Sequence, residues 1–549
     1  MSRDVDAGPD IMRRSSEDSS EPISRKEAII RVGTAVGGLT LATSPASIAS
    51  ASNLLIRSGK TQALTVALSS EPPSLFQNLE DEPQAYSVYD AIFEYLVKPD
   101  ALHPNAGPQP QLAVSWRPIS AAAWEFKLRS GVKFHNGEAW DAEAAKTNFE
   151  VLFSIKPPSP FVSRIAQFDH AEVKDTYTLI IHTKGRWATA PIGLSEIQMA
   201  APAYLKRVGA QTFAQHPVGT GPFKFAQWVK GQAITLQRNP NYWGGRPNLD
   251  QLVFRGIPDP ETRFAALQSG EIQILTDLNV NDVPAANRAG FRVAHARVGQ
   301  SILISPYIVD AQKAHHPIGD PRVRLAMNLA INRPLIIKAI LNGFAFGLGG
   351  QATGPDAFGW NPYIKEYPYN PGRAKALLAE AGHKNGVDLG TFWIGVPGQF
   401  LKQREFAEVL VQQFAAAGMR VHLRFVEYAT FLKMALQEHN LYYMHQSGWQ
   451  YYPAMDASFA LQWYATPNFP IIHTGLGDPH YDKVFAASQA TFDQKRRLSL
   501  LRQCQRIIHD KPGPITLWQH VQIFGMNKSV TGFTPTPDER IHFLHIGRK

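Results

Sequence analysis

Residues 218–275 read VGTGPFKFAQWVKGQAITLQRNPNYWGGRPNLDQLVFRGIPDPETRFAALQSGEIQIL and are the most informative stretch of the chain. Short runs of alternating apolar and polar residues are separated by glycines and prolines, which is typical of strands joined by tight turns at a sheet edge. Residues 260–269 then have the pattern of a helix that Gly270 ends, and a short strand follows. We therefore expect Gly219, Gly221 and Gly231 to serve turns, because GTGPFK lacks the spacing of a phosphate-binding loop.

The segments on either side of this stretch also alternate strands and helices. Period-two patterns predict strands at 63–70, 124–128, 132–134, 175–183 and 419–427. Helical patterns cover 142–153, 321–331, 333–343, 370–382 and 404–418. Asp141 and Asn370 stand where helix caps are expected. A helix followed by a strand at 404–427 resembles part of a βαβ unit, so we expect an α/β fold.

The length and composition limit the class of protein. A chain of 549 residues is too long for one hydrophobic core, so two or three domains are expected. The hydrophobic and charged fractions, 44% and 18%, are ordinary for a soluble globular protein. Cys504 is the only cysteine, which excludes a disulfide framework, and its helical surroundings favour a core position. The net charge of +9 is spread along the chain, so nucleic acid is not an expected partner.

The first 51 residues have the organisation of an export signal. A charged region is followed by an apolar, glycine-rich stretch at 28–42 and by Ala49-Ser50-Ala51, which fits a cleavage site. Ser24-Arg25-Lys26 looks like a variant twin-arginine element. A disordered tail is the alternative. No cysteine follows the apolar stretch, so no lipid anchor is expected there, and no run of 18 apolar residues predicts a membrane span.

Four long blocks, in order, resemble one protein family. The blocks are 112–150, 218–275, 320–343 and 369–382. They resemble the dipeptide- and oligopeptide-type extracellular solute-binding proteins of ABC importers, and the similarity runs from about residue 61 to 545. The resemblance implies a two-lobed periplasmic-binding-protein fold of the α/β class, with mixed sheets, an extra inserted subdomain and a ligand cleft between the lobes.

The resemblance also implies how the chain is divided. Lobe I would comprise 61–100, 215–305 and 516–549, the inserted subdomain 101–214, and lobe II 306–515. Chain crossings near 303–307 and 515–518 would form the hinge.

The function implied by the resemblance is solute capture for import. A ligand buried between two lobes makes its contacts only in the closed state, so it stabilises closure. The protein would be a periplasmic monomer without a cofactor. It would deliver a peptide or peptide-like solute to the membrane permease, which works with its ATPases.

The segment GWQYYPAMD, residues 448–456, is the candidate ligand site. In the family a Gly-Trp pair of the second lobe faces the cleft, and aromatic rings bury much surface with few rotatable bonds. The candidate ligand-binding residues are Trp449, Tyr451, Tyr452, Asp456 and His445. Local packing of the tyrosines beside Pro453 and helix capping by Asp456 are the alternatives.

One departure from the family pattern bears on the ligand. Peptide-binding relatives carry an aspartate about three residues after the tryptophan, where this chain has Tyr452, or Tyr451 if one residue is deleted. A neutral tyrosine cannot pair with an ammonium group as a carboxylate does. Either Asp456 supplies the charge, or the solute is a modified peptide, an amino-acid or opine-like conjugate, an oligosaccharide or a metal chelate.

Other classes of function receive less support. The chain has neither a G-x-S-x-G nor an H-E-x-x-H motif, so an enzyme is not expected. A secreted hydrolase and a solute sensor or chaperone-like module remain the alternatives from other classes. His445, His473 and His480 follow one another along lobe II and could line a cleft, but no metal site is predicted from them.

Overall fold

The computed structural model describes residues 62–549 except 77, 80–84, 101, 104–106, 157, 397–399, 439–443, 453 and 467–473. The chain divides into two units, Met1–Lys60 and Thr61–Lys549, and the description concerns the second. The predicted export signal over 1–51, His473 and Pro453 lie outside the described residues. In the part of the chain that is described, no helix is both long and apolar enough to cross a membrane.

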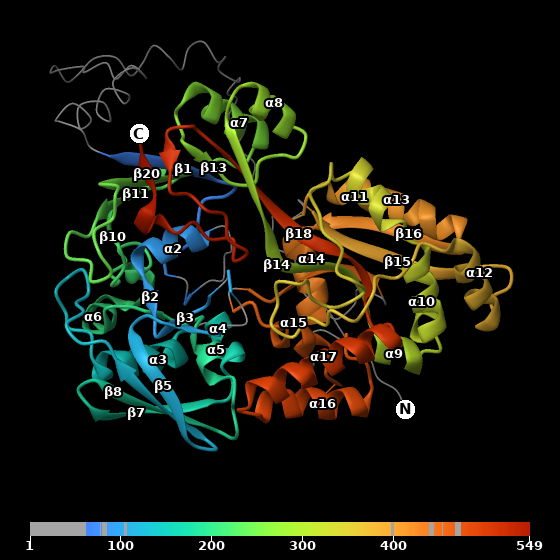
Figure 1. The fold of residues 1–549 in the computed structure, drawn as a ribbon, viewed down its shortest axis with the longest axis horizontal. Coiled ribbons are helices and arrows are strands. Elements are labelled where there is room, and N and C mark those ends of the chain that lie inside the picture. Colours follow the sequence, from blue (N-terminus) through green and yellow to red (C-terminus); the bar gives the residue numbers. More distant parts are fainter. Residues whose placement is uncertain are drawn as a thin grey trace, which may run out of the picture. The chain divides into compact units, whose positions relative to one another are not determined.

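A ten-stranded mixed sheet runs through lobe I and lobe II (Figure 1). In sheet order its strands are β10 (Phe223–Val229), β11 (Ala233–Arg238), β12 (Gln251–Gly256), β1 (Ala63–Leu68), β13 (Ile274–Leu275), β18 (Ile515–Met526), β14 (Arg292–Pro306), β17 (Met444–Gln450), β15 (Val387–Val396) and β16 (Met419–Glu427). β1 pairs in parallel with β12 and β13, and β15 pairs in parallel with β16 and β17, whereas the remaining pairs are antiparallel.

The stretch at 218–275 folds as its pattern predicts. β10, β11 and β12 form an antiparallel meander, with β10 at the edge of the sheet. Helix α7 (Pro260–Ser269) begins after Asp259, whose side chain accepts a hydrogen bond from the Thr262 amide at 2.7 Å. It ends at Gly270, which has a left-handed φ of 82°. Local signals thus determine this part of the fold, since each cap and turn lies beside the element it limits.

Two of the three glycines serve a different purpose from the one predicted. Gly231 has a φ of +72° at the turn between β10 and β11, which confirms its turn role. Gly219 and Gly221 instead lie against the end of helix α2 (Tyr86–Ile92): an added Cβ would be 2.1 Å and 2.7 Å from the Ile92 carbonyl oxygen. The sequence did not reveal this close approach of a distant backbone, which requires glycine at both positions.

The predicted helices are present, and further ones complete the fold. The remaining helices are α3 (Ala142–Ser154), α4 (Pro160–Arg164), α5 (Ala190–Leu194), α6 (Pro202–Phe213), α8 (Val283–Arg288), α9 (Ile308–Lys313), α10 (Pro321–Ala330), α11 (Arg333–Ala339), α12 (Pro371–Glu380), α13 (Gln403–Ala416), α14 (Tyr428–Lys433), α15 (Ser458–Leu461), α16 (Pro479–Ala490) and α17 (Gln494–Asp510). Asp141 caps α3 and Asn370 caps α12, as predicted. β15, α13 and β16 form the expected parallel βαβ unit.

The region of the inserted subdomain has its own antiparallel sheet and core. The sheet order is β5 (Ala113–Ser120), β6 (Ala123–Leu128), β8 (Thr178–Thr183) and β7 (Phe168–Asp175). The short pairs β2 (Glu94–Tyr95) with β9 (Gln198–Met199), β3 (Val97–Lys98) with β4 (Gln109–Pro110), and β19 (Val530–Thr531) with β20 (Gly547–Arg548) lie outside both large sheets. The strand predicted at 132–134 is only an isolated bridge between Lys133 and Ala139, and the strand predicted from 175 begins at Thr178.

Strands β14 and β18 run side by side at the boundary expected between lobe I and lobe II (Figure 1). All 12 residues of β18 are buried. Their pairing shifts register between Arg297 and Ser301, which face Val521 and Gln519. A second register shift lies between Ile302 and Leu303, which face Trp518 and Thr516. This second irregularity coincides with the crossings expected at 303–307 and 515–518, and the first lies a few residues away from them.

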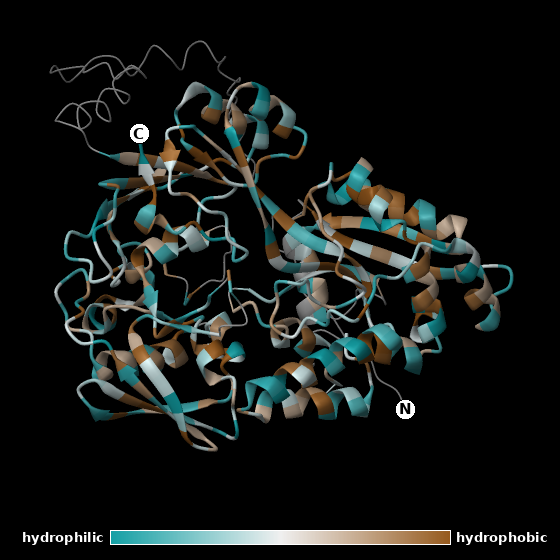
Figure 2. Ribbon diagram, in the orientation of Figure 1, coloured by the Kyte–Doolittle hydropathy of each residue, from teal (hydrophilic) through white to brown (hydrophobic). Residues whose placement is uncertain are grey.

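Helix α17 covers lobe II with an amphipathic face. Hydrophilic and hydrophobic residues alternate along α16 and α17 in Figure 2. Arg497, Leu501, Cys504 and Ile508 form its buried stripe, at the spacing of a helix. The core position expected for Cys504 is confirmed, and burial raises the pKa of its thiol to about 12. A thiol of that kind is not an activated nucleophile.

Candidate functional site

The candidate site begins on strand β17 and continues into the segment after it. β17 pairs with β14 from Met444 opposite Pro306 to Gln450 opposite Gln300. A hydrogen bond of 2.5 Å between the hydroxyls of Ser305 and Ser447 joins the two strands inside the core. Because the end of β17 lies beside the irregular part of β14, residues 449–456 emerge at the junction of the two lobes.

His445 lies on β17 in a closed apolar environment. It is 2% exposed, and its ring meets those of Tyr307 and Phe431 at centroid distances of 5.4 Å and 6.1 Å. Burial lowers the pKa of His445 to about 3, so the imidazole is neutral near pH 7. Among the described residues none forms a hydrogen bond with its Nδ1 atom.

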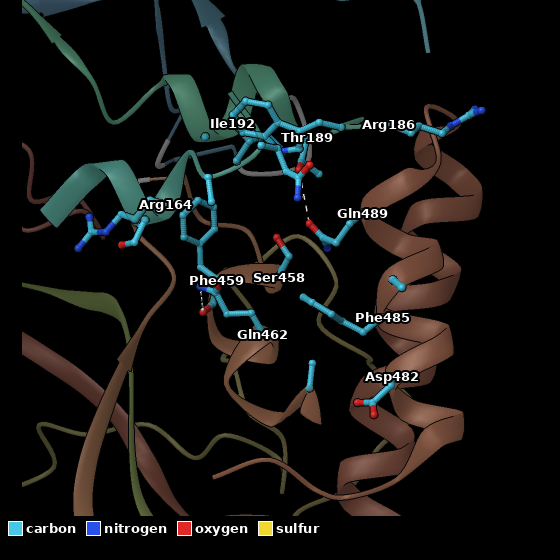
Figure 3. Close-up of a pocket in the computed structure, with 17 residues that line it drawn as sticks. Arg164, Arg186, Thr189, Ile192, Ser458, Phe459, Gln462, Asp482, Phe485 and Gln489 are labelled. Carbon is cyan, nitrogen blue, oxygen red and sulfur yellow. Dashed lines mark hydrogen bonds between the residues drawn. The ribbon is translucent and has the colours of Figure 1, made fainter. Parts of the chain in front are cut away.

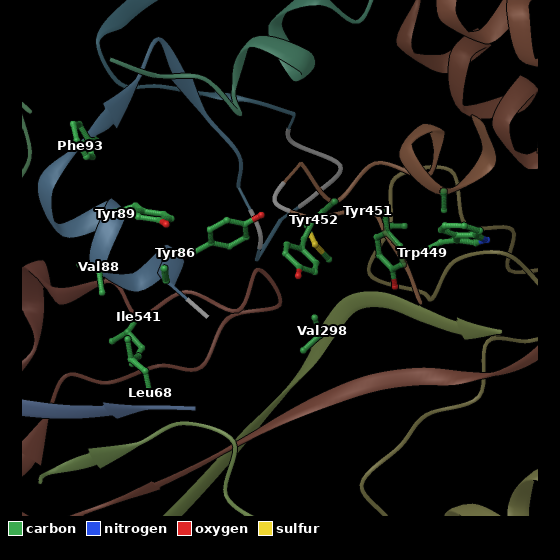
Figure 4. Packing of buried hydrophobic residues seen from close by; sticks show 14 of the residues in the cluster. Leu68, Tyr86, Val88, Tyr89, Phe93, Val298, Trp449, Tyr451, Tyr452 and Ile541 are labelled. Carbon is green, nitrogen blue, oxygen red and sulfur yellow. The ribbon is translucent and has the colours of Figure 1, made fainter. Parts of the chain in front are cut away.

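Trp449 and Tyr451 are both buried in lobe II. Trp449 is 8% exposed and stacks on Trp463, with centroids 4.7 Å apart and planes 12° apart. The hydroxyl of Tyr451 accepts a hydrogen bond from the Gly354 amide at 3.0 Å, and its own amide donates to the Gly299 carbonyl at 2.7 Å. Burial raises the pKa of Tyr451 well above its usual value. Figure 4 shows these rings in a row with that of Tyr452.

Tyr452 connects lobe II to lobe I. Its hydroxyl donates a hydrogen bond to Oε2 of Glu539 at 2.5 Å and accepts one from Nε2 of Gln450 at 2.8 Å. Its ring meets the edge of Tyr86 at a centroid distance of 6.2 Å (Figure 4). Glu539 and Tyr86 lie in segments expected to belong to lobe I, and both are far from Tyr452 in sequence. The side chain is thus in contact with both sides of the predicted cleft.

Asp456 forms a buried ion pair within lobe II. Its two carboxylate oxygens accept hydrogen bonds from Nη1 and Nη2 of Arg497 at 2.6 Å and 2.7 Å. The two side chains are only 3% and 1% exposed. The amide and hydroxyl of Ser458 also donate to Oδ1 of Asp456, at 3.0 Å and 2.6 Å, just before helix α15. The structure therefore separates Asp456 from Tyr452, whose acidic partner is Glu539.

Two cavities lie between the inserted subdomain and lobe II. The larger, of about 530 Å³, has Thr189 and Ile192 on the subdomain side and Ser458, Phe459 and Phe485 on the lobe II side (Figure 3). The smaller, of about 240 Å³, is lined by Asp456, Arg497, Phe358, Trp116 and Trp124, among others.

Direct contacts across the same boundary hold the two parts together. The Ala188 amide donates to the Gln489 carbonyl at 3.1 Å, and Arg186 donates to the Ala490 carbonyl. Trp124 packs against Phe492 at a centroid distance of 5.6 Å. The inserted subdomain is thus joined to the end of helix α16 and to the residues that follow it.

Three polar or aromatic residues of the 218–275 stretch, Asn239, Tyr242 and Trp243, stabilise the fold and do not lie at the candidate site. The Tyr242 hydroxyl and the Trp243 indole each donate to the carboxylate of Glu94 at 2.8 Å. Asn239 donates to the Gly221 carbonyl at 3.2 Å. Burial raises the pKa of Glu94 to about 7 in spite of these bonds. These three residues therefore stabilise the fold through contacts with Glu94 and Gly221.

Some residues of the junction could not be found from the sequence. Glu539 lies 87 positions after Tyr452 in the acidic segment Asp538-Glu539, which reads as an ordinary turn. Tyr86 lies on helix α2 with no motif around it. Of the other histidines, His316 caps a short helix and His480 is exposed. In the described residues no group of three or more His, Cys, Asp or Glu side chains is placed to hold a metal ion.

Comparison with known proteins agrees with this architecture. The model of the family "Bacterial extracellular solute-binding proteins, family 5 Middle" matches residues 107–470. Probable di/tripeptide-binding protein 5 of Pseudomonas aeruginosa is 28% identical over 482 residues, which are 80% of this chain and 87% of that protein. Heme-binding protein A of Haemophilus influenzae is 28% identical over 458 residues, which are 78% and 82% of the two chains.

A solved structure shows the same fold. It is that of the ABC transporter-associated periplasmic binding protein DppA from Helicobacter pylori in complex with the peptide STSA. The TM-score is 0.73 at 26% identity, and the match covers 88% of this chain and 98% of that chain. The expected two-lobed periplasmic-binding-protein fold is confirmed. Since the family model covers well over half of the sequence, the chain belongs to the bacterial extracellular solute-binding proteins of family 5.

Proposed function

We propose that this protein is the periplasmic component of an ABC importer that captures a short peptide or peptide-like solute between lobe I and lobe II. The observation that carries the proposal is the position of Tyr452, which lies in the middle of the candidate segment of lobe II and donates a hydrogen bond to Glu539 of lobe I. Names of relatives support the solute class: one is a di/tripeptide-binding protein, and a solved relative holds the peptide STSA. The family is one of binding proteins, and we propose no enzymatic step.

The ligand-binding residues we propose are Trp449, Tyr451, Tyr452 and His445. The aromatic rings would bury the apolar surface of the solute, and the tyrosine hydroxyls would supply polar contacts. We propose that Asp456 supports the site without contacting the solute. Its bond with Arg497 would hold the segment against helix α17 instead of reaching the solute.

Closure would follow from the paired strands β14 and β18. The register shift between Arg297 and Ser301 offers a place where the two lobes can rotate against each other. The contacts of Tyr452 with Glu539 and of Ala188 with Gln489 would then form on closure. A solute that contacts both lobes favours the closed state by its differential affinity, and the permease would recognise that state. We propose that export through the signal at 1–51 places the protein, as a monomer, in the periplasm.

A second candidate is the same role for a non-peptide solute. A neutral tyrosine stands where peptide-binding relatives have an acid, and one relative is named a heme-binding protein. Thermal and chemical denaturation of the purified protein with and without candidate solutes tests both. A bound solute at one hundred times its dissociation constant adds about 2.7 kcal/mol to the free energy of unfolding. Stabilisation by dipeptides or tripeptides supports the first candidate, and stabilisation only by heme, opine-like compounds or metal chelates favours the second. If none of these solutes stabilises the protein, the transport role is contradicted.

A further inference from the structure

Two acidic residues of lobe I, Glu539 and Asp277, face the junction in an unusual backbone conformation. Their φ angles are 59° and 57°, in the left-handed region that non-glycine residues seldom adopt. Such conformations cost free energy and persist where the surrounding structure fixes them, often at ligand sites. Glu539 lies in the C-terminal segment and Asp277 follows strand β13, so two separate parts of the chain bring the two acids to the junction.

Within the described residues, only one oxygen of the Glu539 carboxylate accepts a hydrogen bond. Oε2 accepts the hydrogen bond from Tyr452, while Oε1 lies 4.0 Å from Nε2 of His520. In the described part of the chain, no side chain or amide donates a hydrogen bond to Oε1, and no lysine or arginine forms an ion pair with Glu539. The neighbouring Arg540 is directed away, toward Asp90 and the hydroxyl of Tyr95. Oε1 is therefore the oxygen that can receive a donor from a solute.

Asp277 adds a second negative charge, and within the described residues its carboxylate forms no ion pair, although the positive charge of Arg263 is close enough to interact with it. Its Oδ1 accepts one hydrogen bond, from Nε2 of Gln522 at 3.2 Å. Arg263 is nearby, but its guanidinium donates to the carbonyls of Ile257, Pro258 and Asp277 at 2.6–3.1 Å and not to the carboxylate. Asp277 also lines a cavity of about 450 Å³ whose other lining residues include Phe400 and the charged residues Arg263, Lys402, Arg404 and Glu405.

Two largely buried polar side chains, His520 and Gln522, lie next to these acids, and one of them points independently to a ligand. His520 is 8% exposed, and within the described residues it forms no hydrogen bond; its ring meets Phe400 at a centroid distance of 5.7 Å. Burial lowers the pKa of His520 to about 4, so it is neutral near pH 7 and does not compensate the carboxylates. Gln522 is also 8% exposed, and its Oε1 has no partner among the described atoms. Buried polar atoms are normally satisfied, so the unpartnered Oε1 of Gln522 indicates that a bound group completes the site.

Burial, more than the neighbouring charges, opposes the ionisation of Glu539. Burial and the negative charges of Asp277 and Asp538 raise the pKa of Glu539 to about 7, against the hydrogen bond from Tyr452 and the positive charge of Arg540. A positive group placed at Oε1 reverses this balance, because an opposite charge within a few ångströms favours the ionised carboxyl. Binding of a cation near pH 6.5 must then release a proton.

We infer that Glu539, with Asp277 beside it, binds a primary ammonium group of the solute, such as the free amino terminus of a short peptide. The inference rests on the proposed function and makes it more specific. Tyr452 and Gln450 fix one oxygen of Glu539, and the other receives the ammonium group. Recognition of a peptide amino terminus then needs no aspartate in the segment after Trp449, because the charge comes from the C-terminal segment of the chain.

Isothermal titration calorimetry with matched dipeptides tests the inference. The probes are Ala-Ala, Ala-Phe and Phe-Ala, each with a free and an N-acetylated amino terminus, at pH 6.5 in two buffers of different ionisation enthalpy. The proteins are the wild type, Glu539→Gln, Asp277→Asn and the control Glu261→Gln, an exposed residue on α7 of the same lobe. Glu539→Gln keeps an oxygen that can accept the Tyr452 hydrogen bond, and its fold is checked by circular dichroism.

The inference predicts that the wild type binds free dipeptides at least about tenfold more tightly than their acetylated forms. It also predicts release of part of a proton per peptide at pH 6.5, because Glu539 is partly protonated before the peptide binds. Glu539→Gln loses both effects, Asp277→Asn loses part of the preference, and Glu261→Gln keeps both.

Three results would overturn the inference. Equal binding of free and acetylated dipeptides by the wild type contradicts it while leaving the peptide-binding function intact. An unchanged preference in Glu539→Gln does the same. If the wild type binds neither form, the proposed peptide function fails, and the inference fails with it. If Glu539→Gln does not fold, the inference is still tested by the preference and the proton release of the wild type and by the Asp277→Asn variant.

Discussion

Replacement of Asp456 by asparagine separates a supporting role in the fold from a direct role in solute binding. In the structure both oxygens of Asp456 are bonded to Arg497, and the two side chains are 3% and 1% exposed. The asparagine keeps the size of the side chain and one acceptor for Ser458 but removes the negative charge. Arg497 is then a buried charge without its counter-ion, which costs about 3–5 kcal/mol of folding free energy. That is a large part of the 5–15 kcal/mol that stabilises a typical protein.

The assay is guanidinium denaturation followed by tryptophan fluorescence, with dipeptide titrations of the same samples. The control is Glu380→Gln, because Glu380 pairs with Arg373 on α12 while both side chains are 49% exposed, and a change below about 1 kcal/mol is expected. The double variant Asp456→Asn/Arg497→Met should recover most of the lost stability, since it removes both charges. A stability loss of less than about 1 kcal/mol together with lost dipeptide binding would refute this reasoning, because Asp456 would then act on the solute.

Three further predictions concern the same region and its support. His445→Phe should remove an acid-sensitive contribution to stability. The pKa of His445 is about 3 in the folded protein and about 6.5 in the unfolded chain, so its contribution is complete above pH 6.5 and about 2 kcal/mol of it is lost by pH 5. Denaturation at both pH values should show this loss in the wild type and not in the variant. Gly221→Ala should destabilise the protein by more than about 2 kcal/mol because its Cβ would meet backbone atoms, whereas Gly231→Ala should cost about 1 kcal/mol for its positive φ; equal losses in thermal melts would contradict this. Trp449→Ala should weaken dipeptide binding at least about tenfold by calorimetry, and unchanged affinity would remove Trp449 from the proposed site.

Local sequence signals predicted the parts of the fold that local physics determines. The meander at 223–256, helix α7 and its end at Gly270 follow from alternation, a capping aspartate and a glycine that adopts a positive φ. The strand expected at 132–134 has the same alternation, but only the isolated bridge from Lys133 to Ala139 pairs with it. Gly219 was assigned to a turn because the helix end that excludes its Cβ comes from residue 92, far away in sequence.

The candidate site shows the same limit more strongly. The family pattern located the segment after β17, and the structure brings that segment to the junction of the lobes. The sequence left two roles open for Asp456, because its partner Arg497 is 41 positions away. It gave no indication of Glu539, whose only link to Tyr452 is a hydrogen bond formed by the folded chain. Charge recognition at this site depends on tertiary contacts that no local pattern records.

Native mass spectrometry of the protein purified from its export compartment tests the central claim most directly. If the protein captures short peptides between its lobes, the wild type should carry one bound dipeptide or tripeptide per chain, or take one up from a dipeptide pool, and Trp449→Ala should lose it. A wild-type protein that is isolated without any bound peptide, and that binds none from the pool, would contradict the claim.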